Sequence, residues 1–284
     1  FTLYLSGLNV NAFEEFSSGE LLRDYKDEDA MYAKVDDPAF RKLFKKHVNA
    51  LFTKGLWHRD FSDCWVVDCP DTSLIGKNFE EIGAVEGKDA VDAYFDLAVQ
   101  YRNDLRWKTN YGNHRPEIMH KLLASPYTHV GFADSGAHLE SIAQYNFPLR
   151  LLKYVRDADE AGLPFMSVAE GVNAVTADLA DWFGLQAGSL RQGSRADVVI
   201  VNPEGLTDEL DDVAWAPLEG TSLNRLVKRN DDAVTATIIN GRVAYDRVQG
   251  FDDELGRERN FGQFLSSMDV KTRVRSTESG LQTA

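Results

Sequence analysis

An aspartate and a histidine four residues apart, Asp134 and His138, are the residues of this sequence best suited to chemistry. The apolar stretch 128–133, THVGFA, leads directly into Asp134 and predicts a buried strand that ends at the carboxylate. A carboxylate at the C-terminal end of a barrel strand can bind a metal ion or take a proton from water. The alternative interpretation is turn chemistry, because Asp before Ser-Gly-Ala is common in turns.

The loop after Asp134 carries two further candidates for substrate binding, Ser135 and His138. The small residues of this Ser-Gly-Ala segment allow the backbone to approach a ligand closely. The His138 imidazole could donate a hydrogen bond to a substrate carboxylate or ligate a metal ion. An isolated histidine is more often structural, so this role depends on both side chains facing one pocket.

A second group of polar residues, Asn113, His114 and Arg115, follows the expected strand 104–110. Asn113 and His114 are candidates for substrate contacts, and Arg115 could pair with an acidic group through two hydrogen bonds. The structural alternative is the start of a helix, with Asn113 as its cap and Pro116 in its first turn. Both interpretations stay open.

The composition is that of a globular chain. Hydrophobic residues make up 43% of the 284 residues, and the formal net charge is −14. An acidic surface repels nucleic acid and anionic membranes, so we expect neither as a partner. The only two cysteines, Cys64 and Cys69, would face opposite sides of one strand, so no disulfide is expected between them. Such sparse cysteine usage predicts a cytoplasmic protein.

Residues 64–183 alternate between strand and helix patterns. The expected strands are 64–69, 104–110 and 128–133, and the expected helices are 76–101, 113–125 and 148–162. A further helix is expected from Asp37, and Ser167 begins a capping box. This alternation predicts parallel βα units, which belong either to a (β/α)8 barrel or to a doubly wound sheet.

The pattern changes after Gly184. An apolar strand is expected at 198–201, and Asn240-Gly241 between alternating strands predicts a two-residue hairpin. We therefore expect three regions: βα units over 1–188, a small β module over 189–262 and a polar tail over 263–284. The sequence contains no G-x-G-x-x-G, P-loop or G-x-S-x-G motif, which leaves dinucleotide, nucleoside-triphosphate and serine-hydrolase functions without support.

Four segments together resemble the C-terminal half of the amidohydrolase superfamily, in particular its N-acyl-D-amino-acid deacylases. They are VGFADSGAHLESIAQYNFPLRLLKYV, VNAVTADLADWFGL, GSLRQGSRADVVIVNPEGL and VTATIINGRVAYD. The resemblance implies an α/β fold, the C-terminal part of a (β/α)8 metal-dependent hydrolase barrel with a small appended β-sandwich module. It implies zinc, one or two divalent metals, and a small-molecule N-acyl amino acid substrate. Asp134 would ligate metal and transfer the proton from the attacking water to the leaving nitrogen, and His138 would contact the substrate carboxylate.

The sequence departs from that family in one large respect. The family's H-x-H pair, bridging ligand and two later histidines are missing, so we expect a C-terminal fragment that binds zinc poorly and is inactive alone. An incomplete barrel would also expose apolar strand edges and aggregate. Two alternatives stay open for the parent protein: a cyclic-amide hydrolase of the dihydroorotase or hydantoinase kind, and a non-catalytic amidohydrolase-like scaffold. Its oligomeric state, including a homo-oligomer, is also open.

Overall fold

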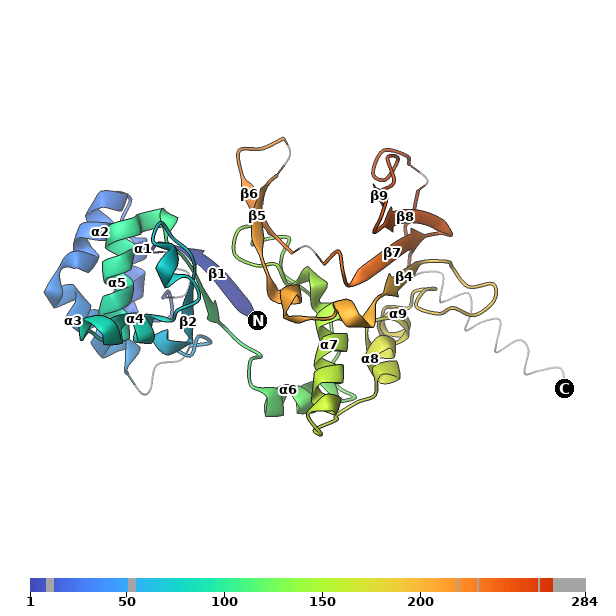
Figure 1. The fold of residues 1–284 in the computed structure, drawn as a ribbon, viewed down its shortest axis with the longest axis horizontal. Coiled ribbons are helices and arrows are strands. Elements are labelled where there is room, and N and C mark those ends of the chain that lie inside the picture. The colour runs from blue at the N-terminus through green and yellow to red at the C-terminus, as the bar shows by residue number, and fades with distance from the viewer. Residues whose placement is uncertain (9–12, 51–54, 219, 229, 260, 268–284) are drawn as a thin grey trace. The chain divides into compact units, whose positions relative to one another are not determined.

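The computed structural model describes residues 1–8, 13–50, 55–218, 220–228, 230–259 and 261–267. The chain is a mixed α/β protein whose contacts divide it into two compact units (Figure 1). The first unit consists of Phe1–Pro116 and His138–Ile142, and the second of Glu117–Ala137 and Ala143–Ala284. The expected division at residues 188 and 189 stays a prediction. Most of the expected polar tail lies outside the described residues.

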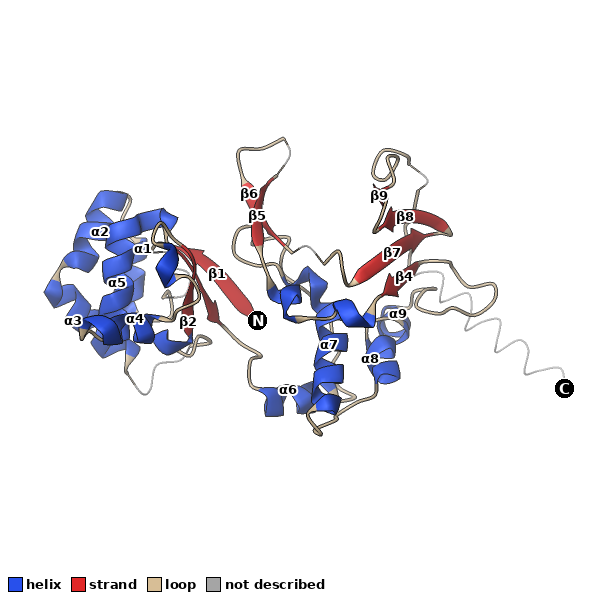
Figure 2. Cartoon of the chain, viewed as in Figure 1, coloured by secondary structure: helices blue, strands red, loops and turns tan. Residues whose placement is uncertain are grey.

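The first unit has a three-stranded antiparallel sheet in the order β1-β3-β2, with helices gathered on one side of it (Figure 2). The strands are β1 (Thr2–Ser6), β2 (Cys64–Asp68) and β3 (Arg106–Asn110). The helices are α1 (Ser17–Arg23), α2 (Glu28–Asp36), α3 (Pro38–Val48), α4 (Phe79–Glu86) and α5 (Ala90–Tyr101). The expected cap of α3 is confirmed, because the Asp37 side chain accepts from the Ala39 N–H. Leu51 and Phe52 of that expected helix lie outside the described residues.

Aromatic side chains fill the core of the first unit. Phe13 is fully buried and contacts the rings of Phe44, Tyr94 and Trp107 at centroid distances of 5.3, 5.7 and 6.1 Å. The polar ends of two of these rings are satisfied inside the core, since Tyr94 Oη and Trp107 Nε1 both donate to the Gly7 carbonyl, at 2.9 and 3.0 Å. Both cysteines are buried and free.

The expectation of parallel βα units is wrong for this sheet, because β3 pairs antiparallel with both neighbours. The reason is a helix break. The expected helix 76–101 is two helices, and α4 ends at Gly87, whose left-handed φ of 68° closes it. Asp89 then caps α5. Two helices reverse the chain once more than one helix would, so β3 runs opposite to β2.

Where the structure describes it, the second unit combines four α-helices with two small sheets. The helices are α6 (Pro116–Leu123), α7 (Phe147–Glu160), α8 (Val168–Ala174) and α9 (Ala177–Phe183). One antiparallel sheet has the order β4-β7-β8-β9, namely Val198–Val201, Val234–Ile239, Arg242–Asp246 and Gly250–Phe251. The other is a hairpin of β5 (Ala214–Pro217) and β6 (Asn224–Val227). The Ser167 capping box and the Asn240-Gly241 hairpin are confirmed, and both turn residues of the hairpin have positive φ.

The expected strand at 128–133 is absent, since these residues have no regular structure. Within the described part of the chain every strand pair is antiparallel, and the strands do not close into a barrel. A strand exists only where a neighbour accepts its hydrogen bonds. The amides of 129–133 bond to no backbone carbonyl among the described residues. Local composition was therefore not sufficient to make this segment a strand.

Candidate functional site

Asp134 lines an open hollow of about 520 Å³ in the second unit. The walls are the loop 132–137 together with the side chains of Tyr145 and Arg225. Tyr145 lies just before α7, and Arg225 comes from β6, so three separate segments of the unit meet here. The volume is in the range of small-molecule sites.

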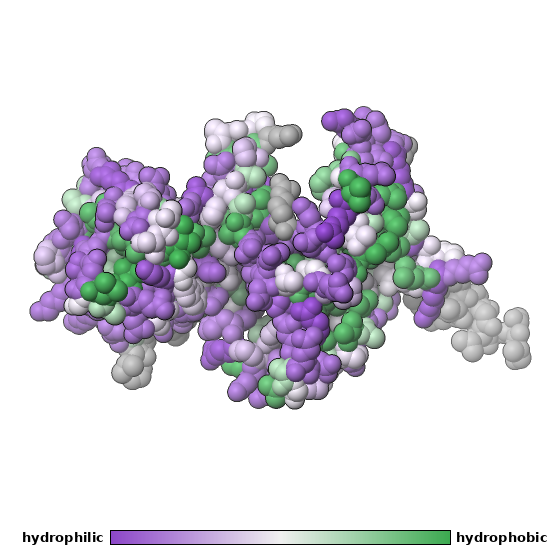
Figure 3. Space-filling view, viewed as in Figure 1, coloured by the Kyte–Doolittle hydropathy of each residue, from purple (hydrophilic) through white to green (hydrophobic). Residues whose placement is uncertain are grey.

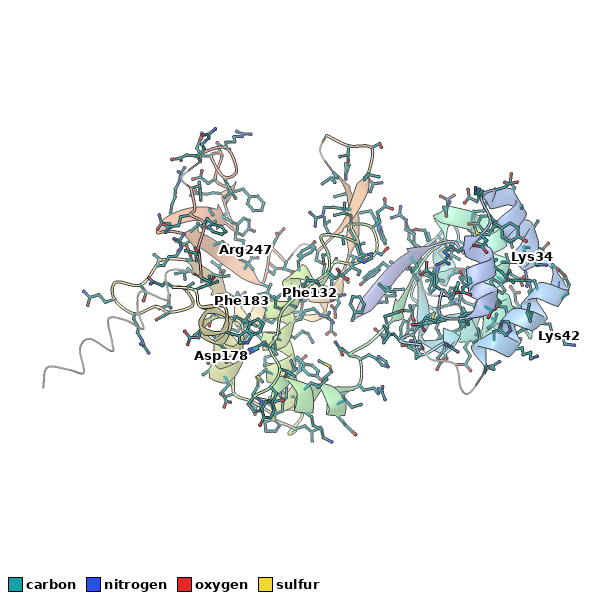
Figure 4. All side chains as sticks on the ribbon, turned by 180° about the vertical axis from the view of Figure 1, so that it is seen from behind. Lys34, Lys42, Phe132, Asp178, Phe183 and Arg247 are labelled. Carbon is teal, nitrogen blue, oxygen red and sulfur yellow. The ribbon has the colours of Figure 1, made fainter. Side chains whose placement is uncertain are left out.

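The backbone of this loop is strained at two positions. Phe132 and Asp134 have φ values of 66° and 52°, a left-handed conformation that costs a non-glycine residue about 1–2 kcal/mol. The Phe132 side chain is 89% exposed, so no burial of its ring offsets that cost (Figure 4). Such strain persists only where neighbouring contacts hold it, and it is typical of functional loops.

Ser135 provides one of those contacts. Its side chain is buried, its Oγ donates to the Ala133 carbonyl at 3.1 Å, and it accepts from the Gln144 N–H at 3.0 Å. The hydroxyl therefore bridges the Asp134 loop and the turn that leads into α7. This placement makes Ser135 a support of the loop, whereas its predicted contact with substrate stays a prediction.

A network of polar side chains continues from that turn. Gln144 accepts from Arg150, and Arg150 Nε lies 2.9 Å from Asp211 Oδ1. The same oxygen lies 3.0 Å from the Nζ of Lys228, whose side chain is only 1% exposed. Lys228 Nζ also donates to the Leu210 carbonyl at 3.1 Å, and its backbone N–H donates to Tyr145 Oη. The network thus connects the loop's supports to the residues that follow β6.

The remaining predicted site residues belong to the first unit. Asn113, His114 and Arg115 lie in the exposed loop before α6, with Asn113 at a φ of 55°. The His138 carbonyl accepts from Ser141 and Ile142, and the Ser141 carbonyl in turn accepts from Tyr4 of β1 at 2.9 Å. The structure therefore brings Asp134 and Ser135 to one hollow and places the other predicted residues in a different unit.

The structure also reveals a histidine cluster that the sequence did not indicate. His58 Nε2 lies 2.8 Å from Asp63 Oδ2, and His58 Nδ1 accepts from the Asp60 N–H at 2.9 Å. The His114 ring stands at a centroid distance of 5.7 Å. Burial lowers the pKa of His58 below its ordinary value, the charge of His114 acts in the same direction, and Asp63 opposes both. Because both ring nitrogens have partners, the arrangement suits a neutral, structural imidazole.

The side chains of the described residues do not form a zinc site. Among the described residues, no group of three or more His, Cys, Asp or Glu side chains could hold a metal ion. A resident zinc takes at least three protein ligands. The described residues do not fit a zinc site of their own, and the predicted role of Asp134 as a metal ligand stays a prediction.

Among the described residues, every helix is too short or too polar to span a membrane.

No protein-family model matches the sequence. An uncharacterized protein from Mycobacterium bovis and another from Mycobacterium tuberculosis are each 41% identical to it over 277 residues. The match covers 95% of this chain and 45% of each relative, so the chain spans less than half the length of these relatives.

Among solved structures, the chain is similar to a D-aminoacylase described as defining a subset of amidohydrolases. That similarity has a TM-score of 0.38 and 19% identity, over 72% of this chain and 37% of the other. An N-acyl-D-glutamate deacylase from Bordetella bronchiseptica, solved with zinc and a phosphonate inhibitor, has a TM-score of 0.38 and 20% identity over 65% of this chain and 35% of its own. A TM-score below 0.5 leaves the fold unassigned, so no residue is matched to either enzyme.

Proposed function

We propose that this chain is the C-terminal part of an amidohydrolase that removes the acyl group from N-acyl-D-amino acids, with Asp134 as its proton-transfer residue. One observation carries the proposal: Asp134 lines an open hollow on a loop that is held in a strained conformation. The four sequence segments that resemble N-acyl-D-amino-acid deacylases add support, because the first of them contains this loop. In the same proposal, the apolar segment 128–133 becomes a strand of a (β/α)8 barrel that other parts of the longer protein complete, and residues 189–262 form a β-sandwich module.

The chemistry asked of Asp134 is proton transfer in both directions. As a carboxylate it takes a proton from the water that attacks the amide carbonyl, so that a C–O bond forms. It then gives that proton to the leaving nitrogen as the C–N bond breaks, which releases a carboxylic acid and a free amino acid. The one or two divalent metals of the proposal would be held mainly by residues outside this chain.

The test is Asp134→Asn in the longer protein, assayed with N-acyl-D-amino acids. An amide cannot accept the proton, so we expect kcat to fall about 10²–10⁴-fold with the fold unchanged. Asp253→Asn, at an exposed aspartate of the same unit, is the matched control and should keep full turnover. Wild-type activity in Asp134→Asn would disprove the proposal, and ring opening of cyclic amides without deacylation would redirect it to the hydantoinase kind.

A further inference from the structure

Arg225, at the same hollow, is a cation without an anionic partner in the described part of the chain. Its side chain is half-buried and lines the hollow together with Tyr145 and the loop 132–137. Among the described residues Arg225 forms no ion pair, and its Nε is buried without a hydrogen-bond partner. By contrast, Arg150, Arg156 and Arg242 of this unit each pair with a carboxylate.

The position of this arginine is fixed by its surroundings. Its guanidinium carbon lies 5.8 Å from the centroid of the Tyr145 ring, a cation–π arrangement. The Tyr145 hydroxyl accepts from the Lys228 N–H, so the ring is tied to the end of the strand that carries Arg225. Next to it, Leu226 is fully buried. The charge is therefore held in place before any ligand arrives.

Arg225 carries a positive charge and has a buried Nε–H without a hydrogen-bond partner among the described residues, and an anionic ligand would compensate the charge. A guanidinium presents its N–H groups in a planar fork that matches a carboxylate with two parallel hydrogen bonds. A dianion is a poorer fit, because it would approach Asp134 in a chain whose formal net charge is −14. A single carboxylate balances the single guanidinium.

We propose that Arg225 binds the carboxylate of the ligand in this hollow. The ligand class is then a small molecule with one free carboxylate, and Arg225 selects it against the corresponding amide. The identity of the bond that is cut rests on the proposed function, whereas the binding of the carboxylate does not.

Calorimetric titration of this chain with N-acetyl-D-alanine and with N-acetyl-D-alaninamide tests the assignment. The two probes differ only in the carboxylate, which is an amide in the second. Their methyl side chain is small and needs little space in the hollow. We expect the acid to bind about tenfold or more tightly than the amide. Arg225→Gln should weaken binding of the acid by a similar factor and leave the amide unchanged, while Arg225→Lys should retain part of the preference.

Arg191→Gln, at an exposed arginine of the same unit, is the matched control and should bind like the wild type. Circular dichroism melting of each variant separates loss of binding from loss of fold. The assignment is overturned if the wild-type chain binds neither probe at millimolar concentration, if it binds both alike, or if folded Arg225→Gln keeps the preference.

Turnover by the longer protein distinguishes this inference from the proposed function. Hydrolysis of both probes at equal rates, unaffected by Arg225→Gln, would support the deacylase proposal and overturn the role of Arg225. Carboxylate-dependent binding that Arg225→Gln removes, without any hydrolysis, would support the role of Arg225 and overturn the deacylase proposal.

Discussion

Lys228 is a buried charged residue that contacts the lining of the hollow, because its backbone N–H donates to the Tyr145 hydroxyl. Its ammonium group is out of contact with water and is compensated by Asp211 Oδ1 at 3.0 Å and by the Leu210 carbonyl at 3.1 Å. A second donor, Asn146 Nδ2, reaches the same carbonyl at 2.8 Å. Buried charges are tolerated only where such partners are complete. The network therefore fixes the position of Lys228, whose backbone N–H donates to the Tyr145 hydroxyl. In this way it also positions the Tyr145 ring that contacts Arg225.

We expect Lys228→Met to destabilise the second unit by about 1–3 kcal/mol, because it removes the charge-assisted hydrogen bond to Asp211 and one of the two donors to the Leu210 carbonyl. Methionine keeps the length and apolar stem of the side chain, so the loss reports the ammonium group. The free energy of unfolding, from urea denaturation, measures the effect. Lys121→Met, at an exposed lysine of α6, is the control and should change stability by less than about 0.5 kcal/mol. Equal stability of Lys228→Met and Lys121→Met would show that the network contributes nothing.

His58 makes the first unit sensitive to pH. Its pKa in the folded chain lies below the ordinary 6.5, mainly through burial, with His114 lowering it further and Asp63 opposing. Between those two pKa values the unfolded chain binds a proton that the folded chain does not, so protons favour unfolding. The stability that neutral His58 contributes to the folded chain is complete above about pH 6.5, and it is lost as the pH falls through the pKa of His58 in the folded chain.

We therefore expect the unfolding temperature of the first unit to drop between pH 7 and pH 5.5, and His58→Gln to flatten that dependence. The indole N–H signal of Trp107, buried in the first unit, follows this transition by NMR. His47→Gln, at a histidine of α3 outside the cluster, should leave the slope as in the wild type. A slope that His58→Gln does not change would assign the pH dependence to other groups.

At the scale of elements, the hairpin of β7 and β8 shows how two residues set a register. Asn240 and Gly241 both have positive φ, of 51° and 82°, and they place Ile239 opposite Arg242. This turn matches the natural twist of the two strands. A Cβ added at Gly241 would meet only Ala196 Cβ, at 3.9 Å, so space is not the constraint.

Gly241→Ala should therefore destabilise the second unit by about 1–2 kcal/mol through backbone conformation alone. Thermal unfolding of the variant measures the loss. Gly112→Ala, where the added Cβ also meets nothing but φ is not positive, is the control and should be close to neutral. A neutral Gly241→Ala would mean that the turn tolerates an ordinary side chain.

Elements with local signals were predictable from the sequence. The Asp37 cap, the Ser167 capping box and the Asn240-Gly241 turn each depend on residues within a few positions of one another, and each is confirmed. Strand direction was not predictable, because it depends on the number of chain reversals. The helix break at Gly87 lies inside a continuous apolar helical pattern, which gives no sign of it. The missing strand at 128–133 has the same cause, since pairing is a non-local property.

The candidate site divides in the same way. Asp134 and Ser135 were found because they adjoin an apolar run in the sequence. Arg225 could not be predicted from the sequence, because it belongs to no motif. It lies on a strand 91 positions after Asp134, and only the fold brings it to the same hollow. The contact between His58 and His114 could not be predicted either, because the two residues are 56 positions apart in the sequence. Only packing brings such residues together.

At the scale of the whole molecule, the second unit leaves apolar side chains at its surface. Figure 3 shows apolar surface over the region of β4, β7 and β8, where Val199, Ile200 and Val243 are 54%, 46% and 49% exposed. Phe132, two residues before Asp134, is 89% exposed, and the His129 ring lies tilted at a centroid distance of 5.0 Å from the ring of Trp182, which is 63% exposed. Surfaces of this kind usually contact another part of a protein.

Hydrogen exchange tests whether the longer protein supplies that contact. If residues 129–133 become a barrel strand there, as the proposed function requires, their amides gain backbone acceptors that they lack among the described residues. We expect these amides to exchange within about tenfold of an unstructured peptide in the chain alone, and at least about 10³-fold more slowly in the longer protein. The amide of Thr237, already paired in β7, should be protected in both and serves as the internal control. Unprotected 129–133 amides in a folded, active longer protein would show that Asp134 works from a loop, without the barrel strand that the sequence predicts.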